Sequence, residues 1–185
     1  MERALVERAQ AGDEDAFTAI ATAVGGRLLA VAYRILRDLG LAEDAVQQAL
    51  VAAWRELPML RDPDRFDAWL YRLLVNACYR EARRSRRFAA NVRILPVEDL
   101  SIPDAALSVA QRDQLDRGFR RLPPEQRAVF VFRHYLGLTE PEIATQLELP
   151  LGTVKSRLHY ARVSMRAALE ADLRPAHESS RERLA

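Results

Sequence analysis

Apolar residues recur every three or four positions along most of the chain, which is the spacing that lines one face of an α-helix. Gly and Pro residues interrupt this pattern at a few points, notably in residues 58–64. The periodicity fades after residue 87 and returns from residue 113. The pattern therefore predicts an all-α fold of two small helical domains, residues 1–87 and 113–173, joined by a flexible linker, 88–112, and followed by a frayed polar tail, 174–185.

The first long helical stretch contains Gly25-Gly26, which predicts either a break or a close contact between helices, because Gly disfavours a helix interior. The composition agrees with a helical fold. Of 185 residues, 49% are hydrophobic, enough to bury a core and to exclude wholesale disorder. The chain has 28 basic and 26 acidic residues, and Lys155 is its only lysine. The net charge of +2 by itself indicates no particular partner.

The sequence lacks the usual signals of membrane insertion, metal binding and catalysis. No run approaches about 18 consecutive apolar residues, and the N-terminus lacks the charge order of a signal peptide. Cys78 is the only cysteine, and the three histidines are far apart, which favours neither a disulfide nor a metal site. Gly-rich phosphate loops and nucleophile elbows are absent from the sequence. We expect a cytoplasmic protein that is not an enzyme, with no cofactor, small-molecule substrate or membrane insertion.

Residues 41–57 read as one amphipathic helix, with apolar residues at steps of three and four. Its opposite face is polar and partly acidic. That face fits two interpretations, a solvated surface or a docking surface for a protein partner, and the spacing is the same for both. The residues concerned are Glu43, Asp44, Gln47 and Gln48.

A second amphipathic helix follows Pro63, and Asp64 or a neighbour can cap its start. Its polar face is a cationic stripe of four arginines with one amide among them. Residues 80–87 hold five arginines against one glutamate, a density that favours a polyphosphate partner. A solvated face or an acidic protein partner also fits this charge. The stripe consists of Arg72, Asn76, Arg80, Arg83 and Arg87.

Two features of this helix point to nucleic acid bases as well as phosphates. An asparagine in a cationic stripe can form paired hydrogen bonds with an adenine edge. Phe66, Trp69 and Tyr71 lie next to the loop of residues 58–65, and unpaired bases stack on such aromatic rings. The alternative is that these rings are part of the core.

Residues 139–166 have the pattern of a helix-turn-helix. Thr139 and Glu142 form a Thr-x-x-Glu capping box at the start of the first helix. Residues 148–152 form the break, and Thr153 can cap the second helix. Such a basic second helix can enter a DNA major groove, although an ordinary hairpin with a solvated face would look similar. The exposed face of the second helix carries Lys155, His159, Arg162 and Arg166.

Seven short runs resemble the extracytoplasmic-function (ECF) sigma factors of the sigma-70 family. Three of them resemble region 2, namely Tyr33 to Asp38, Ala42 to Gln47 and Phe66 to Asn76. Four resemble region 4, namely Leu122 to Arg127, Gly137 to Thr139, Glu142 to Ala144 and Gly152 to Leu158. The resemblance covers about residues 10–87 and 113–170, with both halves in the family's order.

The resemblance implies a transcription initiation factor that binds core RNA polymerase, directs it to promoters and promotes opening of the duplex. The face with Glu43, Asp44, Gln47 and Gln48 would bind the clamp helices of the largest polymerase subunit, and region 4 would bind the flap. An anti-sigma factor would control the protein. The linker would thread through the active-site and RNA-exit channel of the polymerase.

The resemblance also implies two DNA-binding surfaces. Single-stranded −10 DNA would contact region 2, with one base flipped into a pocket, through Phe66, Trp69, Arg72, Asn76, Arg80, Arg83, Arg84 and Arg87. Duplex −35 DNA would contact region 4 through Thr153, Lys155, Ser156, Arg157, His159, Tyr160, Arg162 and Arg166.

Three residues depart from the family pattern. Arg80 stands where Asp or Asn is frequent, which predicts a different −10 preference. Gln48 stands where Glu is usual and removes one charge from the docking face. Glu148 stands where Gly is usual, so either Glu148 adopts a left-handed conformation at a cost of about 1 kcal/mol or the turn differs.

The residues alone also leave two other classes of function open. One is a helix-turn-helix regulator that binds duplex DNA as a dimer without polymerase, and the other is a protein whose cationic stripe binds an acidic partner. A dimer would need a self-complementary apolar helix, and the sequence shows none outside the linker and tail.

Overall fold

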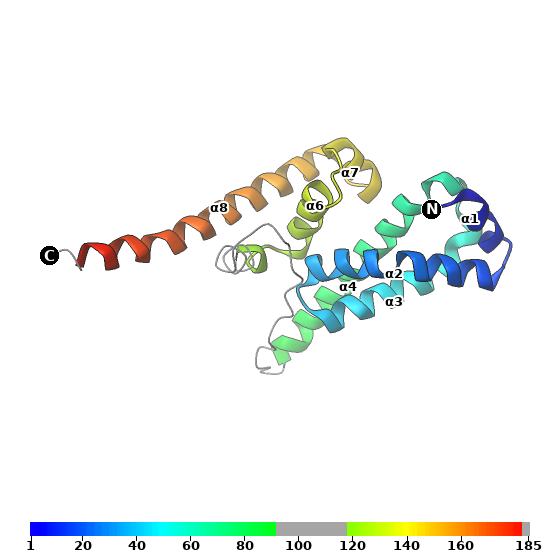
Figure 1. Cartoon of the computed structure of the whole chain (residues 1–185), viewed down its shortest axis with the longest axis horizontal. Coiled ribbons are helices and arrows are strands. Elements are labelled where there is room, and N and C mark those ends of the chain that lie inside the picture. Colours follow the sequence, from blue (N-terminus) through cyan, green and yellow to red (C-terminus); the bar gives the residue numbers. More distant parts are fainter. Residues whose placement is uncertain (92–117, 183–185) are drawn as a thin grey trace.

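A computed structural model describes residues 1–91 and 118–182 of the protein, and the side chains of 1–87 and 118–167. Within these ranges the chain is helical and contains no strand, which confirms the all-α fold class. Figure 1 shows the arrangement. The elements are α1 (Arg3–Gln10), α2 (Glu14–Leu36), α3 (Leu39–Glu56), the short 3-10 helices η1 (Leu57–Met59) and η2 (Pro63–Arg65), α4 (Phe66–Asn91), α6 (Pro124–His134), α7 (Glu140–Leu147) and α8 (Leu151–Glu182).

Aspartates start the two central helices of the N-terminal part. The Asp13 carboxylate accepts a hydrogen bond from the backbone N–H of Ala16 at 2.9 Å, and the Asp38 carboxylate accepts one from Leu41 at 2.8 Å. Helix α3 packs against both α2 and α4. It buries a row of small residues at steps of three and four, which lets neighbouring helices approach closely. This row comprises Ala42, Ala45, Ala49 and Ala53.

Helix α2 runs without interruption through Gly25-Gly26, so the predicted break is wrong. The close-contact alternative is wrong as well, because a Cβ at either glycine would meet no atom within 4 Å. Burial of residues on both sides of the pair, such as Val24 and Leu28, offsets the low helix propensity of Gly. Within the described chain, α2 is the one helix long and apolar enough to cross a membrane by length and composition, and it serves here as a core helix.

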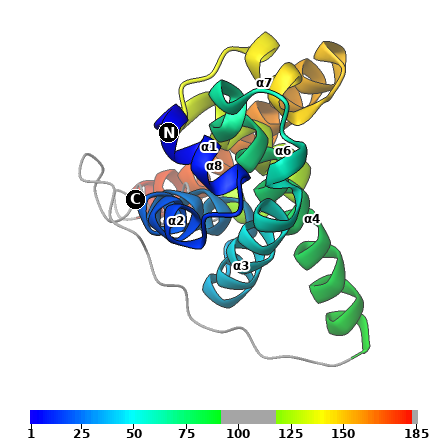
Figure 2. The same ribbon diagram turned by 90° about the vertical axis from the view of Figure 1, so that its right-hand side faces the viewer.

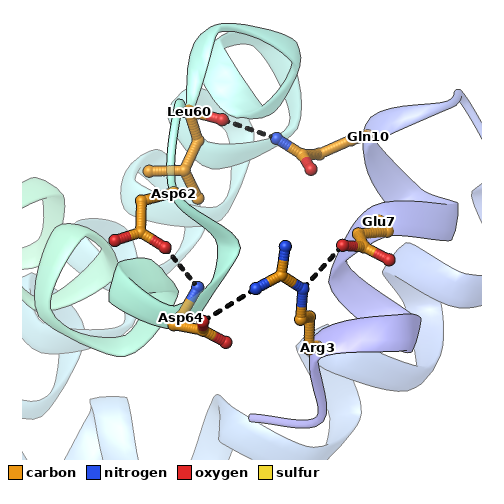
Figure 3. A network of polar contacts seen from close by, with 6 residues as sticks. All are labelled: Arg3, Glu7, Gln10, Leu60, Asp62 and Asp64. Carbon is orange, nitrogen blue, oxygen red and sulfur yellow. Dashed lines mark hydrogen bonds and ion pairs between the residues drawn. The ribbon is translucent and has the colours of Figure 1, made fainter.

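The loop between α3 and α4 is held against α1 (Figure 3). The Gln10 amide donates hydrogen bonds to the carbonyl oxygens of Leu57 and Leu60, at 3.1 and 2.7 Å. Arg3 pairs with Glu7 and with Asp64, each at 2.8 Å. Asp62 caps η2, as expected for a neighbour of Asp64, by accepting a hydrogen bond from the backbone N–H of Asp64 at 3.1 Å. The loop is therefore fixed at the start of α4.

Helices α6, α7 and α8 form the C-terminal part. The predicted capping box is confirmed, because the Thr139 hydroxyl accepts from the backbone N–H of Glu142 while the Glu142 carboxylate accepts from that of Thr139. Thr153 is not the cap of the next helix, since α8 already begins at Leu151 and the Pro150 carbonyl accepts from the Thr153 N–H at 2.8 Å.

Two expectations about the chain segments have mixed outcomes. Backbone helix continues to Asn91 in α4, past the expected start of the linker, and residues 92–112 of that linker lie outside the described residues. The tail from residue 174 is helical as far as Glu182 rather than frayed, since it belongs to α8. This helix extends away from the other helices (Figure 1).

The two parts pack on each other. Helix α6 lies against α2 and α4, and α7 lies against α4 (Figure 2). Apolar residues of both parts join one buried cluster, which includes Leu74 and Cys78 from α4 and Val129 and Phe132 from α6. Burial raises the pKa of the Cys78 thiol to about 12, so this cysteine is a core residue with little thiolate at neutral pH.

Candidate nucleic-acid interface

The outer face of α4 is strongly basic. Its exposed residues are Asn76, Arg80, Arg83, Arg84, Arg86 and Arg87. The one acid in this stretch, Glu81, is only 2% exposed. It accepts a hydrogen bond from the Gln48 amide at 2.5 Å and pairs with Arg84 at 3.5 Å. Because Glu81 faces inward, the outer face presents arginines without an exposed carboxylate between them, which suits a phosphate backbone.

The three aromatic residues near the loop have different environments. Phe66 is 1% exposed and lies in the core, where its ring supports Trp69 with ring centres 5.8 Å apart. Tyr71 is also buried, and burial is the main reason that its pKa is raised. Trp69 is half-buried. It therefore offers the accessible aromatic surface of this group, and Phe66 positions it.

Trp69 and Arg72 line a cleft of about 580 Å³ between α4 and the start of the helix-turn-helix. The opposite wall comes from α7 and the turn after it. Arg72 forms an ion pair across the cleft with Glu148. Arg72, the first residue of the cationic stripe, thus faces the C-terminal part of the chain. The rest of the stripe is exposed to solvent.

Three of the four residues expected on the polar face of α3 are exposed to solvent. Glu43, Asp44 and Gln47 are exposed, whereas Gln48 is half-buried because its amide binds Glu81. Trp54 lies at the surface of the same helix, where its side chain is 36% exposed and its ring centre is 5.0 Å from that of Phe17.

Two other apolar residues near Trp54 are exposed and were missed as possible contact residues. Val51 is 45% exposed and Met59 is 72% exposed. For Trp54, the sequence did contain a signal of surface exposure. Ala49, Ala53 and Leu57 already form the buried face of the helix at steps of four, so Trp54, one residue after Ala53, lies beside that face.

The start of α8 presents the second basic face. Lys155, Ser156, His159 and Tyr160 are exposed, and so are Arg162 and Arg166 farther along. Thr153 and Arg157 are half-buried. Arg157 faces Tyr79 of α4, and its charge partly offsets the effect of burial, which raises the Tyr79 pKa to about 12.

The structure resolves the two alternatives for Glu148. Its φ of 51° and ψ of 44° place it in the left-handed region at the end of α7. Its backbone N–H approaches the carbonyl oxygens of Ala144 and Thr145. A residue with a Cβ is strained there by about 1 kcal/mol relative to Gly, so the turn keeps its glycine-like conformation with a glutamate in it.

Comparisons with known proteins agree with this geometry. The model of Sigma-70 region 2 matches residues 20–88, and the model of Sigma-70 region 4 matches residues 112–165. The RNA polymerase sigma-H factor of Pseudomonas aeruginosa is 31% identical over 187 residues, covering 93% of this chain and 95% of that protein. The chain belongs to the ECF sigma factors of the sigma-70 family. The resemblance found in the sequence is thereby confirmed, and this sigma factor is a promoter-directing transcription initiation factor.

Another relative supports the same assignment, and two solved structures share the fold. The ECF RNA polymerase sigma-E factor of Escherichia coli K12 is 31% identical over 173 residues, covering 87% of this sigma factor and 90% of the relative. A solved structure of CnrH in complex with the cytosolic domain of CnrY has a TM-score of 0.61 at 29% identity, covering 92% of this chain and 97% of that one. RpoE from Bartonella quintana in complex with the anti-sigma factor NepR has a TM-score of 0.66 at 24% identity, covering 84% and 98%.

Proposed function

We propose that this cytoplasmic sigma factor binds core RNA polymerase through region 2 and region 4 and holds the two promoter elements on two separate helices. Helix α4 contacts single-stranded −10 DNA, and the start of α8 contacts duplex −35 DNA. The sigma factor contributes binding energy and uses no cofactor or catalytic residue. The observation that carries the proposal is the pair of exposed basic helix faces, one in each sigma region.

The −10 contact uses the length of α4. Arg80, Arg83, Arg84 and Arg87 bind phosphates of the displaced strand, which is favoured by release of condensed counterions. Asn76 lies one turn before them and is exposed, so its amide can pair with an adenine edge. A base leaving the stack loses a few kcal/mol of stacking, which contact with the Trp69 ring and Arg72 offsets in part.

The −35 contact uses the N-terminal turns of α8. In a helix-turn-helix, the first residues of the second helix reach base edges in the major groove. Lys155, Ser156 and His159 occupy those turns and are exposed, with Tyr160 beside them. Arg162 and Arg166, farther along the same face, bind the phosphate backbone. Thr153 and Arg157 stand at the edge of this face.

The polymerase contact uses α3. Glu43, Asp44 and Gln47 form an exposed polar patch that can bind the clamp helices of the largest subunit. Gln48 acts differently from its neighbours, because its amide is hydrogen-bonded to Glu81 and so links α3 to α4. Region 4 binds the flap. The exposed apolar side chains of Val51, Trp54 and Met59 extend the polymerase-binding surface beyond the polar patch.

Control by an anti-sigma factor completes the proposal. Two similar solved structures are complexes, one of CnrH with the cytosolic domain of CnrY and one of the sigma factor RpoE with the anti-sigma factor NepR. A partner that covers the α3 surface or holds the two sigma regions together would prevent the simultaneous contacts that a promoter requires.

Run-off transcription tests the proposal. Purified core RNA polymerase and fragmented DNA from the source genome are incubated with and without the sigma factor. We expect discrete transcripts that depend on the added protein. No transcripts, together with no retention of core polymerase by the immobilised sigma factor, would overturn the assignment.

A further inference from the structure

The loop between α3 and α4, residues 57–65, is largely exposed to solvent and consists mainly of two one-turn 3-10 helices. In the first turn the Leu60 N–H donates to the Leu57 carbonyl at 3.1 Å, and in the second the Arg65 N–H donates to the Asp62 carbonyl at 3.0 Å. Single turns of this kind are weak on their own. Contacts from outside the loop therefore decide how well it is ordered.

Gln10 of α1 binds the first of these turns at two points. Its amide nitrogen donates to the Leu57 carbonyl at 3.1 Å and to the Leu60 carbonyl at 2.7 Å, and Figure 3 shows the second of these bonds. A primary amide has two N–H groups, so both bonds can form at once. Gln10 is half-buried, which limits competition from water. One side chain of α1 thus fixes the backbone on both sides of the turn.

Arg3 of α1 binds the second turn. Its guanidinium donates to the Asp64 carboxylate and to the Glu7 carboxylate, each at 2.8 Å, so Glu7 orients Arg3 toward the loop (Figure 3). All three side chains are more than half exposed, so this contact is expected to contribute less than the two bonds from Gln10.

The loop forms part of the surface around Trp69. Leu60 and Arg65 line the same cleft as Trp69. Phe66, whose ring supports that of Trp69, follows directly after the second turn. Because Gln10 binds the Leu60 carbonyl, loss of that bond frees Leu60 to move relative to the Trp69 ring while α4 stays in place.

We infer that Gln10 is a positioning residue for −10 recognition, which holds Leu60 at a fixed place beside Trp69 so that an unpaired base meets a preformed surface. This role rests on the proposed contact between Trp69 and −10 DNA. Gln10 acts through the loop backbone and needs no contact with DNA. A preformed surface binds more tightly, because no free energy is then lost in ordering the loop when the base arrives. Arg3 has a lesser part in the same role.

Hydrogen exchange of the full-length protein, without polymerase or DNA, measures how firmly the loop is held. Gln10→Glu keeps the size of the side chain and removes both donors. We expect the backbone amides of Leu60 and Arg65 to exchange at least about threefold faster. The matched control is Arg8→Ala, which removes a polar contact of the same helix with Asp13, outside the loop. It should leave exchange in the loop unchanged, and an unchanged rate for Gln10→Glu would overturn the inference.

Binding of single strands to the holoenzyme measures the consequence for DNA. The strand is the non-template −10 segment of a promoter found by run-off transcription, and each nucleotide is replaced in turn by an abasic residue. We expect Gln10→Glu to weaken binding of the intact strand about fivefold, and Arg8→Ala to leave it unchanged. At the one position whose base contacts Trp69, the abasic strand should bind the Gln10→Glu and parent holoenzymes equally. The reason is that no base remains there to meet the loop.

General damage to region 2 would weaken binding of every strand by the same factor, so that result would overturn the inference. Unchanged affinity for the intact strand would overturn it as well. A parent holoenzyme that binds the intact and abasic strands alike would instead overturn the proposed −10 contact, and this inference with it. The two failures are therefore distinguishable, because only the second appears in the parent.

Arg3→Ala provides a second variant at an exposed side chain, where loss of the fold is not expected. It should weaken binding of the intact strand about twofold, and the loss should again vanish on the strand that is abasic at the Trp69 position. A loss that persists on that abasic strand would contradict a role for α1 that acts through the loop.

Discussion

Helices α4 and α8 both present basic faces, but their surroundings differ in a way that fits different forms of DNA. Helix α4 follows a loop pinned to α1 and has the half-buried Trp69 beside its stripe, so it can bind unstacked bases as well as phosphates. Helix α8 follows a tight turn and presents Lys155 and His159 in its first turns, which is the arrangement that enters a major groove. The elements next to each helix, more than its charge, therefore distinguish binding of unstacked bases from binding of a major groove.

The largest effect is expected from the polar face of α3, which we propose as the polymerase-binding surface on which both DNA contacts depend. Asp44→Arg should weaken binding to core polymerase about a hundredfold, because a reversed charge at an interface costs several kcal/mol. Asp44 is exposed, so the fold should stay intact. Affinity measured by fluorescence anisotropy checks this, with Asp15→Arg as the control, a charge reversal at an exposed residue of α2 that does not line the hollow beside Trp54. Unchanged affinity for Asp44→Arg would refute the docking assignment.

Substitutions in α4 test most directly whether the two helices have different tasks. Arg83→Ala together with Arg84→Ala should slow promoter opening by at least about tenfold, since each lost charged contact contributes more than 1 kcal/mol. The salt dependence should also weaken, by a slope of about 1.4 for two single-strand phosphates. Binding of a −35 duplex should be almost unchanged. An equal loss in both assays would contradict the division of tasks.

The matching change in α8 should have a smaller effect, and it should weaken −35 binding rather than promoter opening. Lys155→Ala should weaken −35 duplex binding about fivefold, at the lower end of the range for a base contact. On a promoter already unpaired at the −10 element, opening should be nearly normal once the complex has formed. A defect in opening that persists at saturating protein would indicate that Lys155 acts outside the −35 element.

The smallest effect concerns the stability of the helix-turn-helix. Thr139→Ala removes the capping box of α7 and should lower the free energy of unfolding of region 4 by about 1 kcal/mol, measured by urea denaturation. Region 2 should be unaffected, since α4 depends on the Asp62 loop instead. A loss of stability in region 2 as well would show that the two sigma regions unfold as one unit.

The same box predicts a dependence on pH. Hydrogen bonds from Thr139 hold the pKa of the Glu142 carboxyl below its usual value. A lowered folded-state pKa contributes stability that is present above the ordinary pKa of 4.5 and is lost as the pH falls through the lowered value. The destabilising effect of Thr139→Ala should therefore shrink in acid. A constant effect down to acidic pH would contradict the role of the charged carboxylate.

Elements with local signals could be predicted from the sequence. The capping box at Thr139 and the aspartate caps lie within three residues of the N–H groups they bind, so a short window contains the whole interaction. The basic faces of α4 and α8 follow from helical spacing alone. Gly25-Gly26 misled because propensity is weak against burial of the surrounding helix.

Interactions between distant residues had no such signal. The pairing of Arg72 with Glu148, and the approach of Arg127 to Leu36, join residues that no periodic pattern relates. The inward position of Glu81 depends on its contact with Gln48 across two helices. The sequence therefore predicted that α4 and the start of α8 have basic faces, but not that Phe66 supports Trp69 from the core or that Arg72 pairs with a residue of region 4.

Permanganate footprinting of a promoter found by run-off transcription tests the central claim most directly, because it reports unpaired thymines at the −10 element while nuclease protection reports the −35 element. We expect reactive −10 thymines and −35 protection when core polymerase and the sigma factor are both present. With Arg83→Ala and Arg84→Ala, protection should stay and the reactive thymines should disappear. Strong protection by the sigma factor without polymerase, with no reactive thymines when polymerase is added, would contradict the account and indicate a stand-alone DNA-binding regulator.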